Sequence, residues 1–406
     1  MLTEPSIKFR VPGHKMDKTR ILILGGTGNT GRLIARLLLE QTEVHLMLAG
    51  RNLAKAQSLA AQLNTRFEGQ RVAAQAADAS DPDSLKAVMG LADLAVVASS
   101  TSQYTSLVAQ AALEKGVDYY DVLYSPTKLA ALQALSGQIE ASGCCFITDG
   151  GFHPGLPAAM VRYAARGFDR LRTAKVGSVI KVDWAGLDMG TETVDEFLSE
   201  FMSFKSLVYK DGSWQDAGMA AMLNPLRMDF GREFGRQYCV PMFLEEMRSL
   251  PEIYPGLAET GFYVGGFNWF VDWIITPLAL AALKISPGKT LRPMARWIRW
   301  GLNTFSKPPY GTLLKAELSG TRQGRARRAE LSLYHPDGYL LTAIPVVACL
   351  MQILDGSARR PGLWLQAHIA EPARLMQDMK LMGVEITEKI SEYDEQHDTD
   401  ETMRPQ

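Results

Sequence analysis

The chain has 406 residues, of which 47% are hydrophobic and 21% charged, and its formal net charge at pH 7 is −1. This size and composition are typical of a two-domain globular protein and exclude a collagen, a coiled coil and a wholly disordered chain. The near-zero net charge gives no overall attraction to nucleic acid, so we expect no nucleic-acid partner. The four cysteines form no CxxC pair and lie near no histidine at ligand spacing, so we expect reduced thiols and no metal site.

Residues 1–18 precede the first predicted strand and are polar and basic. They contain no apolar run of signal-peptide length, so we expect a protein that stays in the cytoplasm. Met16 would also be a natural start. We therefore treat residues 1–18 as an N-terminal extension that takes no part in the fold.

The next segment has the pattern of a dinucleotide-binding turn. An apolar run at 21–24 leads directly into glycines spaced three apart, and leucine and isoleucine recur at helical spacing over 33–38. Such a turn needs glycine for a tight backbone, for close approach of a pyrophosphate and for helix-to-strand packing, and the helix N-terminus then faces the phosphates. The candidate cofactor-binding residues here are Gly25, Thr27, Gly28, Asn29, Thr30 and Gly31.

A second apolar run at 44–50 ends in Arg51 and Asn52, where the second strand of such a domain meets the adenosine ribose. NAD enzymes usually place a carboxylate at this point, whereas an arginine suits a 2′-phosphate. We therefore predict that the protein binds NADP and prefers NADPH to NADH. The alternative is that Arg51 only ends the strand and points to solvent.

The third and fourth predicted strands, at 71–77 and 94–97, end in further candidates. Asp78 lies where a side chain can meet the adenine, although an N-terminal helix cap is an equal alternative. Ser99, Ser100 and Thr101 follow the fourth strand and are expected near the nicotinamide ribose, because ligands bind at the carboxyl ends of parallel strands. Their alternative is a turn and cap.

Strands at 117–123 and 144–149, with helical sequence at 127–141 between them, continue the alternation of strand and helix. This alternation predicts an α/β domain of the Rossmann type, a doubly wound parallel sheet, over residues 19–155. After Gly150 the pattern changes to strand-like runs at 174–182, 313–318 and 329–333, which predict a second α+β domain with a mixed or antiparallel sheet.

An apolar stretch at 262–285, followed by a helix at 289–305 in which Arg and Trp alternate, forms an insertion in this second domain. Asp272, Asn268 and Pro277 argue against a membrane span. Two interpretations of 262–305 stay open. It is either a peripheral membrane contact or lid over an apolar substrate, or a buried helical hairpin or interface of a homodimer.

Four segments resemble the saccharopine dehydrogenase-like oxidoreductases. They are the glycine turn at 25–31, Ala-Gly-Arg-Asn at 49–52, Tyr-Tyr-Asp at 119–121 and Asp-Gly-Gly-Phe-His-Pro-Gly at 149–155. The resemblance implies an NADP-binding domain at 19–155, a substrate and dimerisation domain at 156–355 and a segment at 356–387 that packs back on the first domain. The acidic tail at 388–406 is expected to be disordered.

The resemblance also implies the reaction, since saccharopine reductases use NADPH to reduce an imine. We therefore predict an NADPH-dependent oxidoreductase that transfers hydride to a C=N or C=O bond of an unassigned small-molecule substrate. The sequence shows no arginine cluster that would bind the carboxylates of saccharopine: the candidates are Arg162, Arg166 and Arg236, and each suits a solvated helix face as well. Two alternatives remain, namely an enoyl or other acyl-lipid reductase at a membrane surface and an NADPH-sensing protein without catalysis.

Three residues are candidate proton donors. His153 lies in the glycine-rich turn after the sixth strand, and an imidazole ordinarily titrates near neutral pH. Tyr124 after the fifth strand and Asp183 in the second domain are the weaker candidates. Asp121 and Asp149 are expected to hold loop backbones instead.

Overall fold

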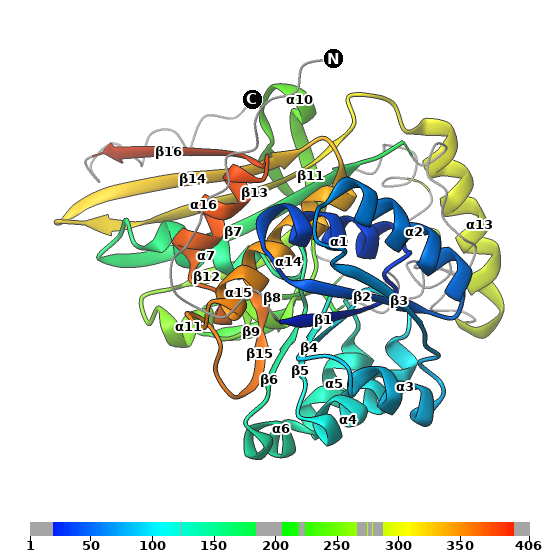
Figure 1. Cartoon of the computed structure of the whole chain (residues 1–406). Coiled ribbons are helices and arrows are strands. Elements are labelled where there is room, and N and C mark those ends of the chain that lie inside the picture. The colour runs from blue at the N-terminus through cyan, green and yellow to red at the C-terminus, as the bar shows by residue number, and fades with distance from the viewer. Residues whose placement is uncertain are drawn as a thin grey trace. The chain divides into compact units, whose positions relative to one another are not determined.

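The computed structural model describes residues 19–122, 124–183, 205–218, 224–265, 274, 278 and 287–393. The chain divides into two compact units, one of Met1–Gly155 and Thr342–Glu371 and the other of Leu156–Leu341 and Pro372–Gln406. Each unit is built around its own β-sheet, and Figure 1 labels the helices and strands of both.

The first unit contains a parallel sheet, seven-stranded over the described residues, with the order β15-β6-β5-β4-β1-β2-β3. Its strands are β1 (Arg20–Leu24), β2 (His45–Gly50), β3 (Val72–Ala76), β4 (Leu94–Val97), β5 (Asp118–Asp121), β6 (Cys145–Thr148) and β15 (Gly362–Leu365). Its helices are α1 (Asn29–Gln41), α2 (Leu53–Arg66), α3 (Pro82–Met89), η2 (Ser102–Tyr104), α4 (Thr105–Lys115), α5 (Pro126–Ala134), α6 (Ser136–Ser142), α15 (Gln366–Ile369) and residues 342–354 of α14 (Gly338–Leu354). The predicted doubly wound α/β fold is confirmed, and the strand order reverses between β1 and β4, which is where such sheets bind ligands.

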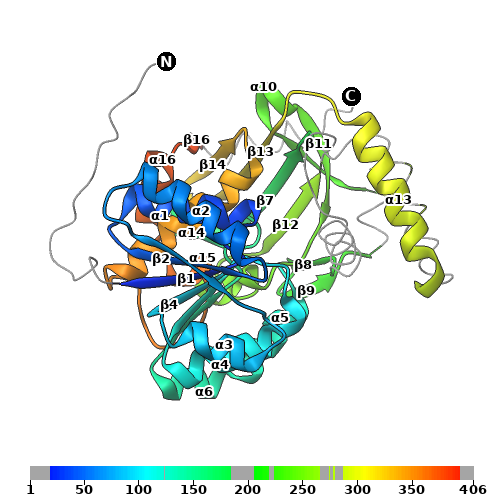
Figure 2. The same cartoon turned by 45° about the vertical axis from the view of Figure 1, so that its right-hand side comes forward.

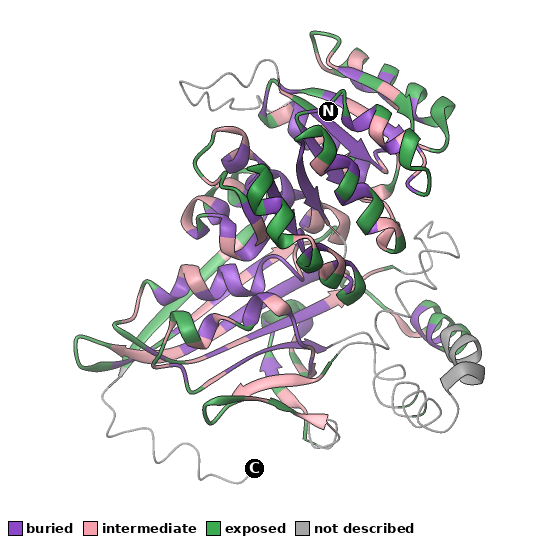
Figure 3. Cartoon of the chain, turned by 90° about the horizontal axis from the view of Figure 1, so that it is seen from below, coloured by how far each residue is buried: buried purple, intermediate pink, exposed green. Residues whose placement is uncertain are grey.

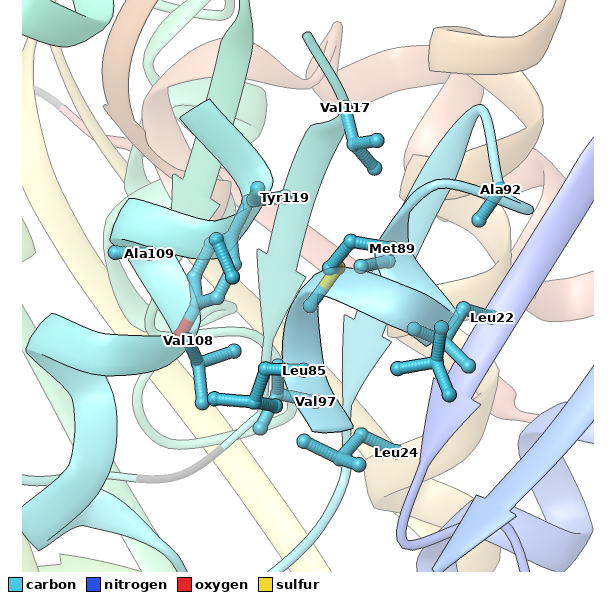
Figure 4. Packing of buried hydrophobic residues seen from close by; sticks show 14 of the residues in the cluster. Leu22, Leu24, Leu85, Met89, Ala92, Val97, Val108, Ala109, Val117 and Tyr119 are labelled. Carbon is cyan, nitrogen blue, oxygen red and sulfur yellow. The ribbon is translucent and has the colours of Figure 1, made fainter. Parts of the chain in front are cut away.

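Helices cover both faces of this sheet, as the fully buried residues of β1 and β4 require. Figure 2 shows α1 and α2 on one side of the strands and α3, α4 and α6 on the other. In Figure 4, Leu85 and Met89 of α3 lie against Leu22 and Leu24 of β1. Each such leucine contributes about 1.5–3 kcal/mol when it is buried, so this packing holds the strand ends of the sheet in place.

The second unit contains a mixed sheet of nine strands over the described residues, and its main path is β10-β11-β12-β7-β13-β14-β16. Only β12 and β7 pair in parallel among the pairs described, and the others are antiparallel. The strands are β7 (Arg170–Lys181), β8 (Leu207–Lys210), β9 (Ser213–Asp216), β10 (Leu226–Asp229), β11 (Arg236–Pro241), β12 (Glu259–Gly265), β13 (Gly311–Arg322), β14 (Arg325–His335) and β16 (Glu385–Tyr393). The helices are α7 (Pro157–Ala165), α10 (Gly231–Phe234), η3 (Glu245–Met247), α11 (Leu250–Ile253), α13 (Pro287–Phe305) and α16 (Pro372–Leu381). Figure 3 colours the chain by burial; in this unit the central strands β12 and β13 are mostly buried, whereas the strands β9 and β16 are mostly exposed.

The structure differs from the sequence-based expectation at two places in this unit. Residues 262–265 belong to β12, so they are strand and not part of an apolar insertion, and most of 266–286 lies outside the described residues. Residues 388–393, expected to be disordered, belong to β16, which pairs antiparallel with β14. Its sequence is polar enough to favour disorder in isolation, but the open edge of β14 supplies the backbone hydrogen bonds that order it.

Within the described residues, no helix combines the length and the apolar character that crossing a membrane requires. All four cysteines are buried free thiols. Burial raises the pKa of Cys145 to about 11 and that of Cys349 to about 12, so both stay protonated and unreactive at neutral pH.

Candidate functional site

The turn between β1 and α1 is tight and is held by backbone hydrogen bonds. The N–H of Gly25 donates to the carbonyl of Ala49 at 2.9 Å, and the N–H of Gly28 donates to the carbonyl of Gly25, also at 2.9 Å. Gly25 has φ +84°, in the left-handed region that favours glycine. A Cβ on Gly31 would lie 2.3 Å from the carbonyl oxygen of Gly25. Glycine is therefore required at both positions for the close approach of α1 to β1.

The N-terminus of α1 is open to an anion. Gly28 is its N-cap and provides no side-chain cap, and the first turn contains no acidic residue. The N–H groups of Asn29, Thr30 and Gly31 have no partner within the helix, because the first intrahelical bond runs from Arg32 to the carbonyl of Gly28. These donors, at the positive end of the helix dipole, fit the pyrophosphate of a dinucleotide.

The predicted adenosine-side residues lie at the ends of β2 and β3. Arg51 is exposed directly after β2, and Asn52 caps α2 by accepting from the N–H of Lys55 at 2.9 Å. Asp78 accepts from the N–H and the hydroxyl of Ser80, which lower its pKa, and the nearby charge of Arg51 lowers it further. The side chain of Asn52 is thus committed to the helix cap. Asp78 does not cap α3, because that helix has Asp81 as its N-cap.

The hydroxyl residues after β4 form a small cluster of their own. The Oγ of Ser99 and the Oγ1 of Thr101 are 2.9 Å apart, and the N–H of Thr101 donates to the carbonyl of Ser99 at 2.8 Å. Thr101 precedes η2 but makes no side-chain cap bond to it, and Ser100 is exposed. This arrangement removes the helix-cap alternative for Thr101 and leaves a turn whose hydroxyls lie at the carboxyl end of the sheet.

A buried lysine joins the ends of β5 and β6. The Nζ of Lys128, from α5, contacts Oδ1 of Asp121 and lies 3.2 Å from Oδ1 of Asp149, and all three side chains are at most 3% exposed. The hydroxyl of Thr148 also donates to Oδ1 of Asp121, at 3.0 Å. Burial by itself would lower the pKa of Lys128, but the two carboxylates raise it above its ordinary value. Lys128 therefore stays a cation at neutral pH and compensates two buried negative charges.

A small pocket lies beside this triad, where β4 and β5 end. It is lined by hydroxyl, phenol, carboxylate and ammonium groups over an apolar base: Val97, Ser99, Thr101, Ser102, Thr105, Val108, Tyr119, Asp121 and Lys128. Tyr119 is fully buried, and burial together with the negative charge of Asp121 raises its pKa well above the ordinary value. The phenol and the ammonium therefore both stay protonated beside the Asp121 carboxylate, next to the Ser99 and Thr101 hydroxyls.

The turn after β6, residues 149–155, is held by Gln366 of α15. The amide nitrogen of Gln366 donates to the carbonyls of Gly151 and Gly155, both at 3.0 Å. Its carbonyl oxygen accepts from the N–H of Gly151 at 3.1 Å and from the hydroxyl of Tyr120. A glutamine from the C-terminal part of the chain thus determines the conformation of the turn that carries His153.

The three candidate proton donors have different surroundings. Burial lowers the pKa of His153 to about 3, so its imidazole is neutral at pH 7, in contrast to the expected titration near neutrality. Tyr124 is half-buried in the loop between β5 and α5. Asp183 is exposed after β7 and belongs to the second unit. Their assignment as proton donors stays a prediction.

Sequence reasoning missed Lys128 and Gln366. One signal for a buried cation was present, because Asp121 ends β5 and Asp149 directly follows the neighbouring strand β6, and two such carboxylates need a positive partner. The sequence also placed Lys128 in the first turn of a helix, because Ser125, three residues earlier, is the N-cap of α5 and accepts from the N–H of Lys128. Gln366 had no comparable signal, because its partners lie more than 200 residues earlier in the chain.

Comparison with known families matches the part of the chain that carries these residues, and comparison with solved structures matches most of the chain. Residues 21–143 match the family model of the saccharopine dehydrogenase NADP binding domain. Saccharopine dehydrogenase (L-Glu forming) from Saccharomyces cerevisiae, solved in its apo form, is 16% identical with a TM-score of 0.66, over 92% of this chain and 100% of that one. At this identity the likeness shows a shared fold alone.

Two further solved structures are less similar. A meso-dapdh mutant with DAP from Clostridium tetani is 10% identical with a TM-score of 0.44, over 88% of this chain and 95% of that one. A dehydrogenase from Chromobacterium violaceum is 12% identical with a TM-score of 0.42, over 91% and 94%. Comparison with curated proteins finds no significant sequence match.

Proposed function

We propose that this chain, whose residues 21–143 belong to the saccharopine dehydrogenase NADP-binding domain family, prefers NADPH and transfers its hydride to a C=N or C=O bond. That it is an NAD(P)-dependent oxidoreductase follows from the family match together with the fold. The choice of NADPH and of the reducible bond is our proposal. The observation that carries the choice of NADPH is the uncapped N-terminus of α1 with the exposed Arg51 at the end of β2.

The preference for NADPH rests on Arg51. A guanidinium at the end of β2 can bind a 2′-phosphate through two charge-assisted hydrogen bonds, whereas NADH offers only hydroxyls there. Asp78, whose pKa the charge of Arg51 lowers, already accepts two hydrogen bonds from Ser80. Arg51 therefore supplies a positive charge that a phosphate can share.

The reduced nicotinamide, when bound, supplies the hydride, and the chain's own residues have to position it and hold protons. Ser99 and Thr101 present hydroxyls at the carboxyl end of β4, where the nicotinamide ribose of a Rossmann domain lies. The charged Lys128 and the protonated Tyr119 give the adjoining pocket a fixed polarity. A neutral His153 could deliver a proton only as an imidazole N–H, so Tyr124 and Asp183 remain alternatives.

The C=N assignment is supported by the family name, since saccharopine is formed through an imine, and the domain match covers the cofactor site only. The test is oxidation of NADPH by the purified protein, followed by its absorbance. We expect turnover with 2-oxo acids or aldehydes mixed with amino acids, and we expect Arg51→Ala to lose it at low NADPH concentration. Each carbonyl without amine is the control that separates C=N from C=O reduction.

Two results would contradict the proposal. Turnover only with enoyl thioesters would move the reaction to C=C bonds. Tight NADPH binding without turnover on any carbonyl, imine or enoyl compound would instead support the NADPH-sensing alternative.

A further inference from the structure

Helix α13, Pro287–Phe305, is labelled in Figure 2 and carries two exposed tryptophans and two exposed arginines. The side chains of Trp297 and Trp300 are 54% and 53% exposed, whereas Ile298 and Leu302 are each 5% exposed. Arg296 and Arg299 are exposed as well, so the buried and exposed residues alternate with helical spacing. The described part of α13 is therefore amphipathic, and its outer face carries large aromatic rings beside cations.

The sequence around this helix is strongly basic. Residues 273–316 contain no Asp and no Glu, although the whole chain has a formal net charge of −1. The basic residues in this segment are Lys284, Lys289, Arg292, Arg296, Arg299, Lys307 and Lys315. In the sequence, positions 289, 292, 296 and 299 are three, four and three residues apart, which is the spacing of one stripe along a helix. The positive charge is thus concentrated along α13.

Two further apolar residues earlier in the same basic segment are also exposed. Ile274 and Leu278 are 38% and 52% exposed. Water-exposed Trp, Ile and Leu side chains within one short basic segment are unusual on the surface of a monomeric globular protein. Such exposure marks a surface that binds a protein, a ligand or a membrane. Tryptophan is the residue most suited to the boundary between lipid headgroups and acyl chains, and arginine is attracted to anionic headgroups.

We propose that the face of α13 that carries Arg296, Trp297, Arg299 and Trp300 binds the surface of an anionic membrane, with the helix lying in the plane of the interface. The arginines provide the attraction to the headgroups, and the indole rings insert at headgroup depth. This contact does not depend on which substrate the NADPH site reduces, so its test uses no activity measurement.

A single-stranded nucleic acid could also use arginines beside aromatic rings, through phosphate contacts and base stacking. The lipid surface is the better match, because the same basic segment also exposes Ile274 and Leu278, whose aliphatic side chains cannot stack on bases. The two occupants are separated by the experiment below.

The experiment is co-sedimentation of the full-length protein with vesicles of phosphatidylcholine, pure or mixed with phosphatidylserine. We expect binding to the mixed vesicles only, and a loss of binding at high salt. Each cation near an anionic surface strengthens binding about fivefold, so R296Q/R299Q should bind roughly 25-fold more weakly. W297A/W300A should lose binding at either salt concentration. R232Q/R325Q, which removes two exposed arginines elsewhere in the second unit, is the charge-matched control and should bind like the wild type.

All four substituted side chains of α13 are exposed, so the thermal unfolding temperature should not change and loss of fold would not explain a loss of binding. The proposal is overturned if the wild type does not sediment with mixed vesicles, or if the α13 variants and R232Q/R325Q bind equally well. It is also overturned if a single-stranded oligonucleotide binds the wild type and displaces the vesicles while R296Q/R299Q loses the oligonucleotide.

Discussion

Replacing Lys128 with Met removes the cation between two buried carboxylates while it keeps the length and most of the apolar volume of the side chain. Lys128 contacts Asp121 and Asp149, and no side chain of the three is more than 3% exposed. The variant therefore leaves two negative charges facing each other out of contact with water, unless one carboxyl takes up a proton.

The cost of this change is large because the charges are buried. Removing one partner of a buried ion pair typically destabilises a protein by about 3–5 kcal/mol, and here one cation compensates two carboxylates. Asp121 retains hydrogen bonds from the hydroxyl of Thr148 and the N–H of Asp149, which offset part of the loss. We therefore expect Lys128→Met to lower the free energy of unfolding by about 3–5 kcal/mol at neutral pH.

The loss should depend on pH in one direction. In the variant, burial and mutual repulsion raise the folded-state pKa of the carboxyls above the unfolded value of about 4. A group whose pKa is raised on folding stabilises the folded state below the unfolded pKa, and that stability is lost as the pH rises through the folded pKa. The deficit relative to wild type should thus be smallest near pH 4 and grow towards pH 7.

Urea unfolding followed by circular dichroism at several pH values measures this deficit. Lys128→Met/Asp149→Asn should recover part of the stability at neutral pH, because one buried charge is removed with its repulsion. Lys86→Met is the control, since Lys86 pairs with Glu114 at 3.0 Å on the surface and its loss should hardly change the unfolding free energy. A deficit below about 1 kcal/mol, or one that does not shrink in acid, would refute the role assigned to Lys128.

Three further substitutions test the first unit. Arg51→Ala should weaken NADPH binding about 10–100-fold in fluorescence titration and leave NADH binding unchanged, and equal losses would remove the 2′-phosphate contact. Gly31→Ala should abolish dinucleotide binding, because its Cβ would lie 2.3 Å from the carbonyl oxygen of Gly25, whereas Gly137→Ala, with no atom within 4 Å, should bind normally. His153 has a folded pKa of about 3 against 6.5 ordinarily, so folding favours its neutral form, and the wild type should lose stability as the pH falls from 6.5 towards 3. His153→Gln should lack the part of the stability loss in acid that protonation of His153 causes, and identical pH profiles of thermal unfolding would show that the fold does not hold the His153 imidazole neutral.

The parts of the site that were predicted from the sequence are the local ones. The β1 strand, the glycine turn and α1 are contiguous over residues 20–41, so their hydrophobic pattern and glycine spacing are readable without knowing any partner. Arg51 could also be singled out from the sequence, because the residue after the second strand of this fold lies where the adenosine ribose of a dinucleotide binds. Local sequence thus determined the fold class of the first unit and its glycine turn, whereas the cofactor contacts of this turn and of Arg51 stay predictions.

Tertiary structure decided the pairings between distant segments. Gln366 reaches Gly151 across 215 residues, and β15 adds to the sheet beside β6 although the second unit separates them in sequence. The polar β16 becomes a strand only because β14 offers it an edge. The environment of Lys128 was likewise decided by tertiary structure, because its charged state depends on two carboxylates that lie at the ends of two neighbouring strands. Periodicity reports which face of an element is apolar, whereas the buried polar contacts that shape this site depend on which strand ends and helices meet in the folded chain.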